Sequence, residues 1–231
     1  MQLGFVLHRR PYRETSLLVD LFTEHSGYIR AVCRGGQRKS LAALMQPFYP
    51  LTLSFKGQGE LVTLLQTEPR GMPHTLTSER LYAGLYVNEL LVRLLPIGVP
   101  CPELFSVYQS TLIKLADKAS ASLEPMLRQF EFILLTELGV AFDFQHDAHG
   151  VPIESGGRYV WYSEQGFCRN DSDANGISGD SLLEIGFGQL NNIANQRVAK
   201  QLCRQALSGF LGKKPLKSRE LFAQFLRGKR R

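Results

Sequence analysis

The residues best suited to binding chemistry in this chain of 231 residues are lysines and arginines gathered toward its two ends. Residues 182–231 contain eleven Lys or Arg and two carboxylates, whereas the preceding stretch, 142–179, is acidic. Residues 1–78 carry a milder excess, with nine basic and five acidic side chains. Over the whole chain, 27 basic and 21 acidic residues give a net charge of +6. Charge clustered in this way favours a polyanion, either nucleic acid or an anionic membrane surface.

The N-terminal cations are interleaved with aromatic residues. A groove of this composition would bind the backbone of a single strand through counterion release, and an exposed ring could stack on a base. The predicted contacts are Arg9, Arg10, Tyr12, Arg13, Arg30, Arg34, Arg38 and Lys39. Tyr28 is a second candidate for stacking. The alternative is that Tyr28 fills the barrel and that the arginines only make the loops soluble.

A second basic group lies near the C-terminus, where a positive loop leads into a predicted helix capped by Ser218. Free backbone N–H groups at a helix N-terminus favour phosphate. The predicted contacts here are Lys213, Lys214, Lys217 and Arg219. The alternative is a solvated loop whose cations pair with the acidic middle segment.

Arg128 stands near the start of the most apolar helix, an unusual place for a permanent cation. It could pair with Glu124 or Glu131, each within helical reach. It could instead lie at the rim of a groove that takes an acidic, hydrophobic C-terminal peptide, with the guanidinium binding the terminal carboxylate. The predicted groove residues, besides Arg128, are Leu127, Phe130, Ile133 and Leu134.

Motifs for catalysis or cofactor binding are missing from the sequence. It has no Walker loop, dinucleotide fingerprint, nucleophile elbow or HExxH motif, so we expect a binding protein without a cofactor rather than an enzyme. The four cysteines lie far apart with no CxxC pair, and no metal site is predicted. Two groups of polar residues allow alternatives with less support. Asp143, His146, Asp147 and His149 could form a metal site, and Asp171, Asp173 and Asp180 could hold magnesium in a nuclease. Both groups are more typical of polar loops.

The first 78 residues read as a small β-barrel. Strand-sized apolar runs alternate with glycine-containing turns, and they cover 3–7, 17–22, 28–33, 51–55 and 61–65. Helical spacing recurs between the third and fourth runs, at 40–49. Five strands with a helical insert at this point are typical of an OB-fold.

After Ser78 the apolar period becomes that of helices. Helices are predicted at 78–95, 104–115, 125–138, from about 182, at 194–211 and at 219–226. The sequence thus predicts an α+β protein with an OB-fold domain at 1–78 and a mostly helical domain at 79–231. The segment from about 142 to 180 is irregular, with possible hairpin strands at 158–162 and 166–169.

The membrane alternative has little support. No apolar window reaches the roughly 18 residues that a spanning helix needs, and residues 1–10 do not have the order of a signal peptide. We therefore expect a cytoplasmic protein that does not bind membranes.

Several short motifs, taken in their order and spacing, resemble the RecO family of bacterial recombination mediators over nearly the whole chain. They are Phe5-Val6-Leu7-His8, Glu14-Thr15-Ser16-Leu17, Phe22-Thr23-Glu24 with Gly27, 85–91, 127–131 and 214–222. The resemblance implies a DNA repair protein that binds single- and double-stranded DNA and anneals complementary strands. It also implies contact with the C-terminal tail of single-stranded-DNA-binding protein, cooperation with RecR in loading RecA, and a place at the nucleoid.

The acidic tail of single-stranded-DNA-binding protein, which ends in Phe, is a ligand that the Arg128 groove would suit. One departure from the family concerns the four-cysteine zinc module that many members carry, because 145–179 contains Cys168 alone. A cluster of Tyr159, Trp161, Tyr162 and Phe167 could keep the module's shape without metal. An RNA-binding or ribosome-associated OB-fold protein would share the same charge and stays open as an alternative.

Overall fold

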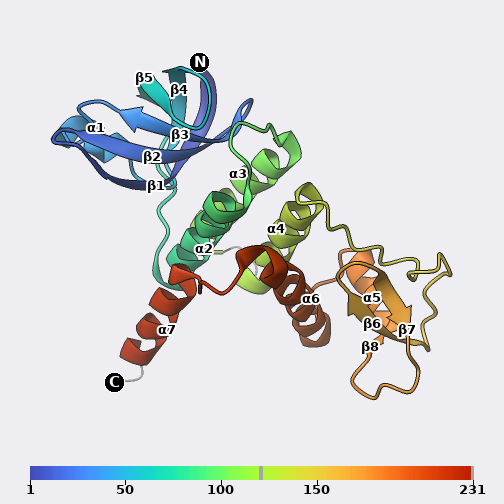
Figure 1. Cartoon of the computed structure of the whole chain (residues 1–231). Helices are drawn as coiled ribbons and strands as arrows, with labels where there is room; N and C mark the ends of the chain where they lie inside the picture. Colours follow the sequence, from blue (N-terminus) through green and yellow to red (C-terminus); the bar gives the residue numbers. More distant parts are fainter. Residues whose placement is uncertain (120–121, 230–231) are drawn as a thin grey trace. The chain divides into compact units, whose positions relative to one another are not determined.

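The structure, a computed structural model, describes residues 1–119 and 122–229 (Figure 1). Its first five strands are β1 (Gln2–Tyr12), β2 (Ser16–Thr23), β3 (Gly27–Cys33), β4 (Pro50–Lys56) and β5 (Val62–Pro69). They close into a barrel in the order β1-β2-β3-β5-β4, with the short helix α1 (Lys39–Leu44) between β3 and β4. This topology confirms the predicted OB-fold.

Alternation along β2 and β3 separates the two sides of the barrel wall. Successive strand residues point to opposite faces, and the odd-numbered residues of both strands fill the interior with Val6, Met45, Leu51, Leu53, Val62 and Leu64. The even-numbered residues, which include Asp20 and Arg30, therefore point outward. This outer surface is free to bind a partner or to receive a helix.

A β-bulge in β1 provides the connection between the barrel and the helices. The register with β2 skips Leu7, since Val6 pairs with Leu21 and His8 with Asp20. A bulged residue is left out of the ladder, and the Leu7 carbonyl accepts a hydrogen bond of 3.0 Å from Asn88 Nδ2. The Tyr108 hydroxyl donates to Asn88 Oδ1 at 2.9 Å. All three residues are buried.

The helices begin where the strand pattern ends, as predicted. They are α2 (Ser78–Leu94), α3 (Pro102–Ala116), α4 (Leu123–Glu137), α5 (Gly179–Gly186), α6 (Ile193–Leu211) and α7 (Lys217–Lys229). The last of them, α7, packs on α2 through Phe222 and Phe225, whose rings lie 5.6 and 4.9 Å from the Tyr82 ring. In Figure 1, α7 is the red helix beside α2.

The segment predicted as irregular contains a small antiparallel sheet, and its first two strands confirm the predicted hairpin. Its strands are β6 (Arg158–Tyr162), β7 (Gly166–Arg169) and β8 (Ile177–Ser178), in the order β7-β6-β8. An aromatic cluster packs against the sheet, formed by Phe132, Phe142, Phe144, Trp161 and Phe167. Of the predicted members of the cluster, Tyr162 is 48% exposed and so does not belong to a core.

The chain folds into two compact units. One contains Met1–Leu123 together with Lys213–Arg231, and the other contains Glu124–Gly212. Ser78 marks the change from strands to helices, but the compact units divide the chain elsewhere, because α2, α3 and α7 belong with the barrel. Within the described residues, no helix is both long and apolar enough to cross a membrane.

Replacing Asn88 with Leu should lower the free energy of unfolding by about 2 to 6 kcal/mol, because each of two buried polar groups left without a partner costs about 1 to 3 kcal/mol. The two groups affected are the Leu7 carbonyl and the Tyr108 hydroxyl. Urea unfolding followed by circular dichroism measures the change. The exposed Asn191 is the matched control, and Asn191→Leu should stay within about 0.5 kcal/mol of the unsubstituted protein. Equal stability of the two variants would contradict this role for Asn88.

Candidate nucleic-acid interface

The outward side chains of β1, β2 and β3 form three rows across the strands, which together with Tyr12 we call the strand face. From the hairpin end inward, the rows are Arg10, Leu18 and Val32; His8, Asp20 and Arg30; and Phe5, Phe22 and Tyr28. In an OB-fold this surface, around strands 2 and 3, is the one that binds oligonucleotides. Its three rows have different chemistry and different exposure.

The aromatic row is covered by the chain itself. The Phe22 ring lies 5.2 Å from Phe105 and 5.5 Å from Tyr108, both on α3. Tyr28 is 2% exposed, and its carbonyl accepts a hydrogen bond of 2.7 Å from Gly98 N. The Tyr28 ring therefore cannot stack on a base, and that prediction is wrong. The alternative, a Tyr28 inside the barrel, is wrong as well, because the residue points outward beneath the loop between α2 and α3.

The middle row is a network of charged and polar groups around Asp20. The Tyr28 hydroxyl donates to Asp20 Oδ1 at 2.7 Å, and Arg30 Nε donates to the same oxygen at 3.1 Å. His8 Nδ1 lies 3.5 Å from Asp20 Oδ2. Burial alone would raise the pKa of Asp20, but the hydrogen bonds from His8, Tyr28 and Arg30 lower it below its usual value. Asp20 is thus a carboxylate embedded in a basic surface.

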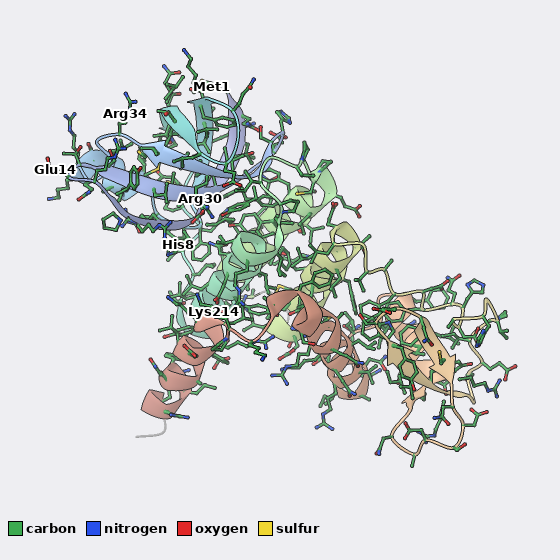
Figure 2. The ribbon with its side chains drawn as sticks, viewed as in Figure 1. Met1, His8, Glu14, Arg30, Arg34 and Lys214 are labelled. Carbon is green, nitrogen blue, oxygen red and sulfur yellow. The ribbon has the colours of Figure 1, made fainter. Side chains whose placement is uncertain are left out.

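In the row nearest the β1–β2 hairpin Leu18 is buried, but the charged side chains at and beside its β1 end are accessible. Arg10 and Arg13 are exposed and Tyr12 is half-buried, with the Arg13 guanidinium 5.2 Å from the centre of the Tyr12 ring. Neither arginine forms an ion pair with any residue that the structure describes. Figure 2 places the labelled Arg30 and His8 on the same side of the barrel. Arg10, Tyr12, Arg13 and Arg30 are the predicted contacts that the fold brings together.

The remaining N-terminal cations lie apart from the strand face. Arg9 donates to the Ala42 carbonyl at 2.7 Å and so fastens β1 to α1. Arg34 lines a hollow of about 300 Å³ beside β5, whose walls include Leu65 and Glu68. Figure 2 shows Arg34 on the opposite side of the barrel from His8. Arg38 and Lys39 are exposed at the start of α1.

The backbone N–H groups at the start of α7 are not free to bind phosphate, contrary to the prediction from the sequence. Glu89 on α2 accepts hydrogen bonds from Lys217 N at 2.9 Å and from Ser218 N at 2.8 Å. It also accepts from the Ser218 hydroxyl at 2.6 Å. The N–H groups predicted to bind phosphate thus already hold a carboxylate, and Ser218 lies inside the helix rather than at its cap.

The basic side chains around the start of α7 remain at the surface. Lys213, Lys214, Lys217 and Arg219 are exposed, and the Arg219 guanidinium lies 5.4 Å from the centre of the Tyr86 ring. Because Asn88 contacts Leu7 and the next residue, Glu89, holds Lys217, consecutive residues of α2 join β1 to the start of α7.

Arg128 forms the internal pair that the sequence offered as an alternative. Its Nη1 and Nη2 each lie 2.9 Å from a carboxylate oxygen of Glu131, and the two residues are 4% and 1% exposed. Phe130 and Leu134 are fully buried, so they do not line an open groove, while Leu127 and Ile133 are partly exposed. Binding of a peptide at Arg128 stays a prediction.

The acidic loop residues have structural partners. Asp143 and Asp147 accept backbone N–H groups within their own turns. Asp171 accepts from Arg158 N at 3.0 Å and pairs with Arg169 at 2.8 Å. Over 1–119 and 122–229, no three His, Cys, Asp or Glu side chains gather in a way that could hold a metal ion.

An OB barrel with an open basic strand face defines a class of protein, the OB-fold nucleic-acid-binding proteins. Comparison with known proteins narrows this class. Residues 1–72 match the family described as Recombination protein O N terminal, and residues 76–220 match Recombination protein O C terminal. The chain belongs to the RecO family.

Relatives of this chain are similar to it over almost their whole length. The DNA repair protein RecO of Pseudomonas paraeruginosa is 45% identical over 222 residues, which cover 96% of this chain and 94% of the relative. The protein of the same name from Haemophilus influenzae strain PittGG is 44% identical over 228 residues, covering 97% and 96%. That of Actinobacillus succinogenes is 44% identical over 226 residues, covering 96% and 94%.

The lowered pKa of Asp20 predicts how stability depends on pH. A carboxyl whose pKa is lower in the folded state stabilises the fold above its unfolded pKa, and this contribution is lost as the pH falls through the folded value. Asp20→Asn should therefore be less stable than the unsubstituted protein at neutral pH, and the difference should shrink below about pH 4. Urea midpoints measured across this range test it, and a difference that stays constant with pH would contradict the role of the Asp20 charge.

Proposed function

We propose that this protein is a DNA repair and recombination mediator that binds single-stranded DNA on its strand face. The observation that carries the proposal is the set of Arg10 and Arg13, which are exposed, and Tyr12 and Arg30, which are half-buried, on the surface that OB-folds use for oligonucleotides. Membership of the RecO family, whose named relatives are DNA repair proteins, supports DNA as the polyanion.

The arginines and the tyrosine of the strand face would contact different parts of the DNA strand, its phosphate backbone and its bases. The guanidinium groups of Arg10, Arg13 and Arg30 would contact phosphates and release counterions from the strand. The half-buried Tyr12 ring would offer a stacking surface, which is worth about 1 to 3 kcal/mol per base and tolerates any sequence. Such a site holds a strand without reading its sequence, as a protein that acts throughout a genome requires.

A second strand would lie along the cations at the start of α7. Lys213, Lys214, Lys217 and Arg219 are exposed there. Because α2 joins this segment to β1 through consecutive residues, both surfaces belong to the same compact unit. Neutralising the phosphates of both strands lowers the repulsion that opposes pairing. The proposed consequence is annealing of complementary strands.

The protein partners follow from the family resemblance. We infer cooperation with RecR in loading RecA, and contact with the C-terminal tail of single-stranded-DNA-binding protein. The Arg128–Glu131 pair limits how the tail could bind at Arg128, because a peptide carboxylate would have to replace Glu131 at the guanidinium. The exchange would leave a buried charge without its partner, which is costly. Arg128 would bind the tail only where the peptide supplies equivalent hydrogen bonds.

The salt dependence of DNA binding tests the strand face. Each phosphate contact to a single strand contributes about −0.7 to the slope of log K against log salt. The double substitution Arg10→Ala and Arg13→Ala should therefore weaken binding of a fluorescent oligonucleotide and make the slope shallower by about 1.4. Fluorescence polarisation over a salt series measures both effects.

The matched control removes two exposed cations elsewhere in the same compact unit, with Lys114→Ala and Lys118→Ala. This variant should keep the slope and affinity of the unsubstituted protein. Equal losses in the two variants would contradict a localised site. Competition with RNA of the same sequence separates the proposal from the RNA-binding alternative, since RNA that displaces DNA at lower concentration would favour the latter.

A further inference from the structure

Asp20 is an unexpected residue on a surface proposed to bind DNA. Its carboxylate is ionised at neutral pH and lies in the middle row of the strand face, where it repels phosphate. The side chain is almost wholly buried, so it cannot itself contact a strand. A carboxylate here would weaken DNA binding unless it also stabilises a contact that favours binding.

The geometry of Arg30 indicates that role. Arg30 Nε donates to Asp20 Oδ1 at 3.1 Å, and Nη2 donates to the Tyr28 hydroxyl at 3.0 Å. Two donors on one edge of the planar guanidinium are thus fixed, which determines its orientation. Nη1 has no hydrogen-bond partner among the described residues, and the side chain is 34% exposed. The fixed edge faces the protein and leaves Nη1 for a ligand.

Tyr28 is in turn held by the loop between α2 and α3. Gly98 N donates to the Tyr28 carbonyl at 2.7 Å, and Ile97 forms a β-bridge with Tyr28. Gly27 permits this approach, because a Cβ there would lie 1.9 Å from the Val99 carbonyl oxygen. The hydroxyl that Asp20 and Arg30 share is therefore positioned by a loop that lies against the aromatic row of the strand face.

We propose that Asp20 and Tyr28 are positioning residues of the DNA site, which hold the Arg30 guanidinium so that Nη1 projects toward the phosphate backbone. The inference rests on the proposed function of the strand face. Ordering Arg30 in advance removes part of the side-chain entropy that binding would otherwise cost. It also links the loop between α2 and α3 to the DNA site through Tyr28.

Tyr28→Phe tests the proposal without changing any charge. Tyr28 is buried and cannot reach the strand, so an effect on binding must act through another residue. We expect the affinity for a fluorescent single-stranded oligonucleotide to fall about 3- to 10-fold, the scale of one lost hydrogen bond. Tyr82→Phe is the matched control and should bind normally, because no hydrogen bond of the Tyr82 hydroxyl exists within the described residues.

Two further variants keep the test decisive where Tyr28→Phe fails to fold. Asp20→Asn removes a negative charge, so electrostatics alone would strengthen DNA binding, whereas loss of positioning weakens it. Arg30→Lys keeps the charge but cannot span Tyr28 and Asp20, and it should bind as weakly as Arg30→Ala. Circular dichroism establishes that each variant is folded.

The outcomes separate this inference from the proposed function. If Arg10→Ala with Arg13→Ala weakens binding while folded Tyr28→Phe binds normally, the positioning role is wrong and the strand face stands. Tighter binding by Asp20→Asn, or normal binding by Arg30→Lys, would overturn the positioning role in the same way. If neither the double variant nor Arg30→Ala alters binding, the proposed function of the strand face is itself wrong.

Discussion

The hydrogen bond between Asn88 and the bulged carbonyl of Leu7 is the constraint on which the arrangement of the first compact unit depends. A closed barrel has no free edge for a helix to join, so contact must come from a bulge or from side chains. The bulge supplies the carbonyl, and Tyr108 completes the partners of Asn88. With α2 and α3 fixed in this way, the aromatic row of the strand face is covered, whereas Arg10, His8 and Arg30 in the other two rows keep exposed surface.

The cations of the strand face are of two kinds, those that are exposed at the hairpin and one that hydrogen bonds hold in place. Arg10 and Arg13 at the hairpin are exposed and form no ion pair within the described residues, whereas Arg30 is held by Asp20 and Tyr28. A free cation gains from counterion release but loses rotamer entropy when it binds, and a fixed cation has already lost it. The strand face thus combines two exposed cations at its rim with one cation that hydrogen bonds hold in place. Glu89 plays a comparable part at α7, where it fastens the helix while the nearby lysines stay exposed.

Hydrophobic periodicity was sufficient to predict the strands, the helical insert and most helices, because each is a local pattern. The contacts between distant residues were not accessible in this way. Nothing local indicates that Glu89 would occupy the start of α7, or that a loop would bury Tyr28. The alternation of β3 alone could have placed Tyr28 beside Arg30 on the outer surface. The alternation of β1 could not be predicted in the same way, because the bulge at Leu7 shifts it. The Arg128–Glu131 pair, by contrast, follows from helical spacing and was foreseen as an alternative.

Hydrogen exchange measured with and without a short single-stranded oligonucleotide tests the central claim most directly, because it locates binding without any substitution. The account predicts slower exchange on DNA addition in 8–16 and 29–35, which contain Arg10, Arg30 and the hairpin of the strand face. Protection confined to 124–212, with no change in β1 or β3, would contradict the assignment of the strand face as the single-strand site.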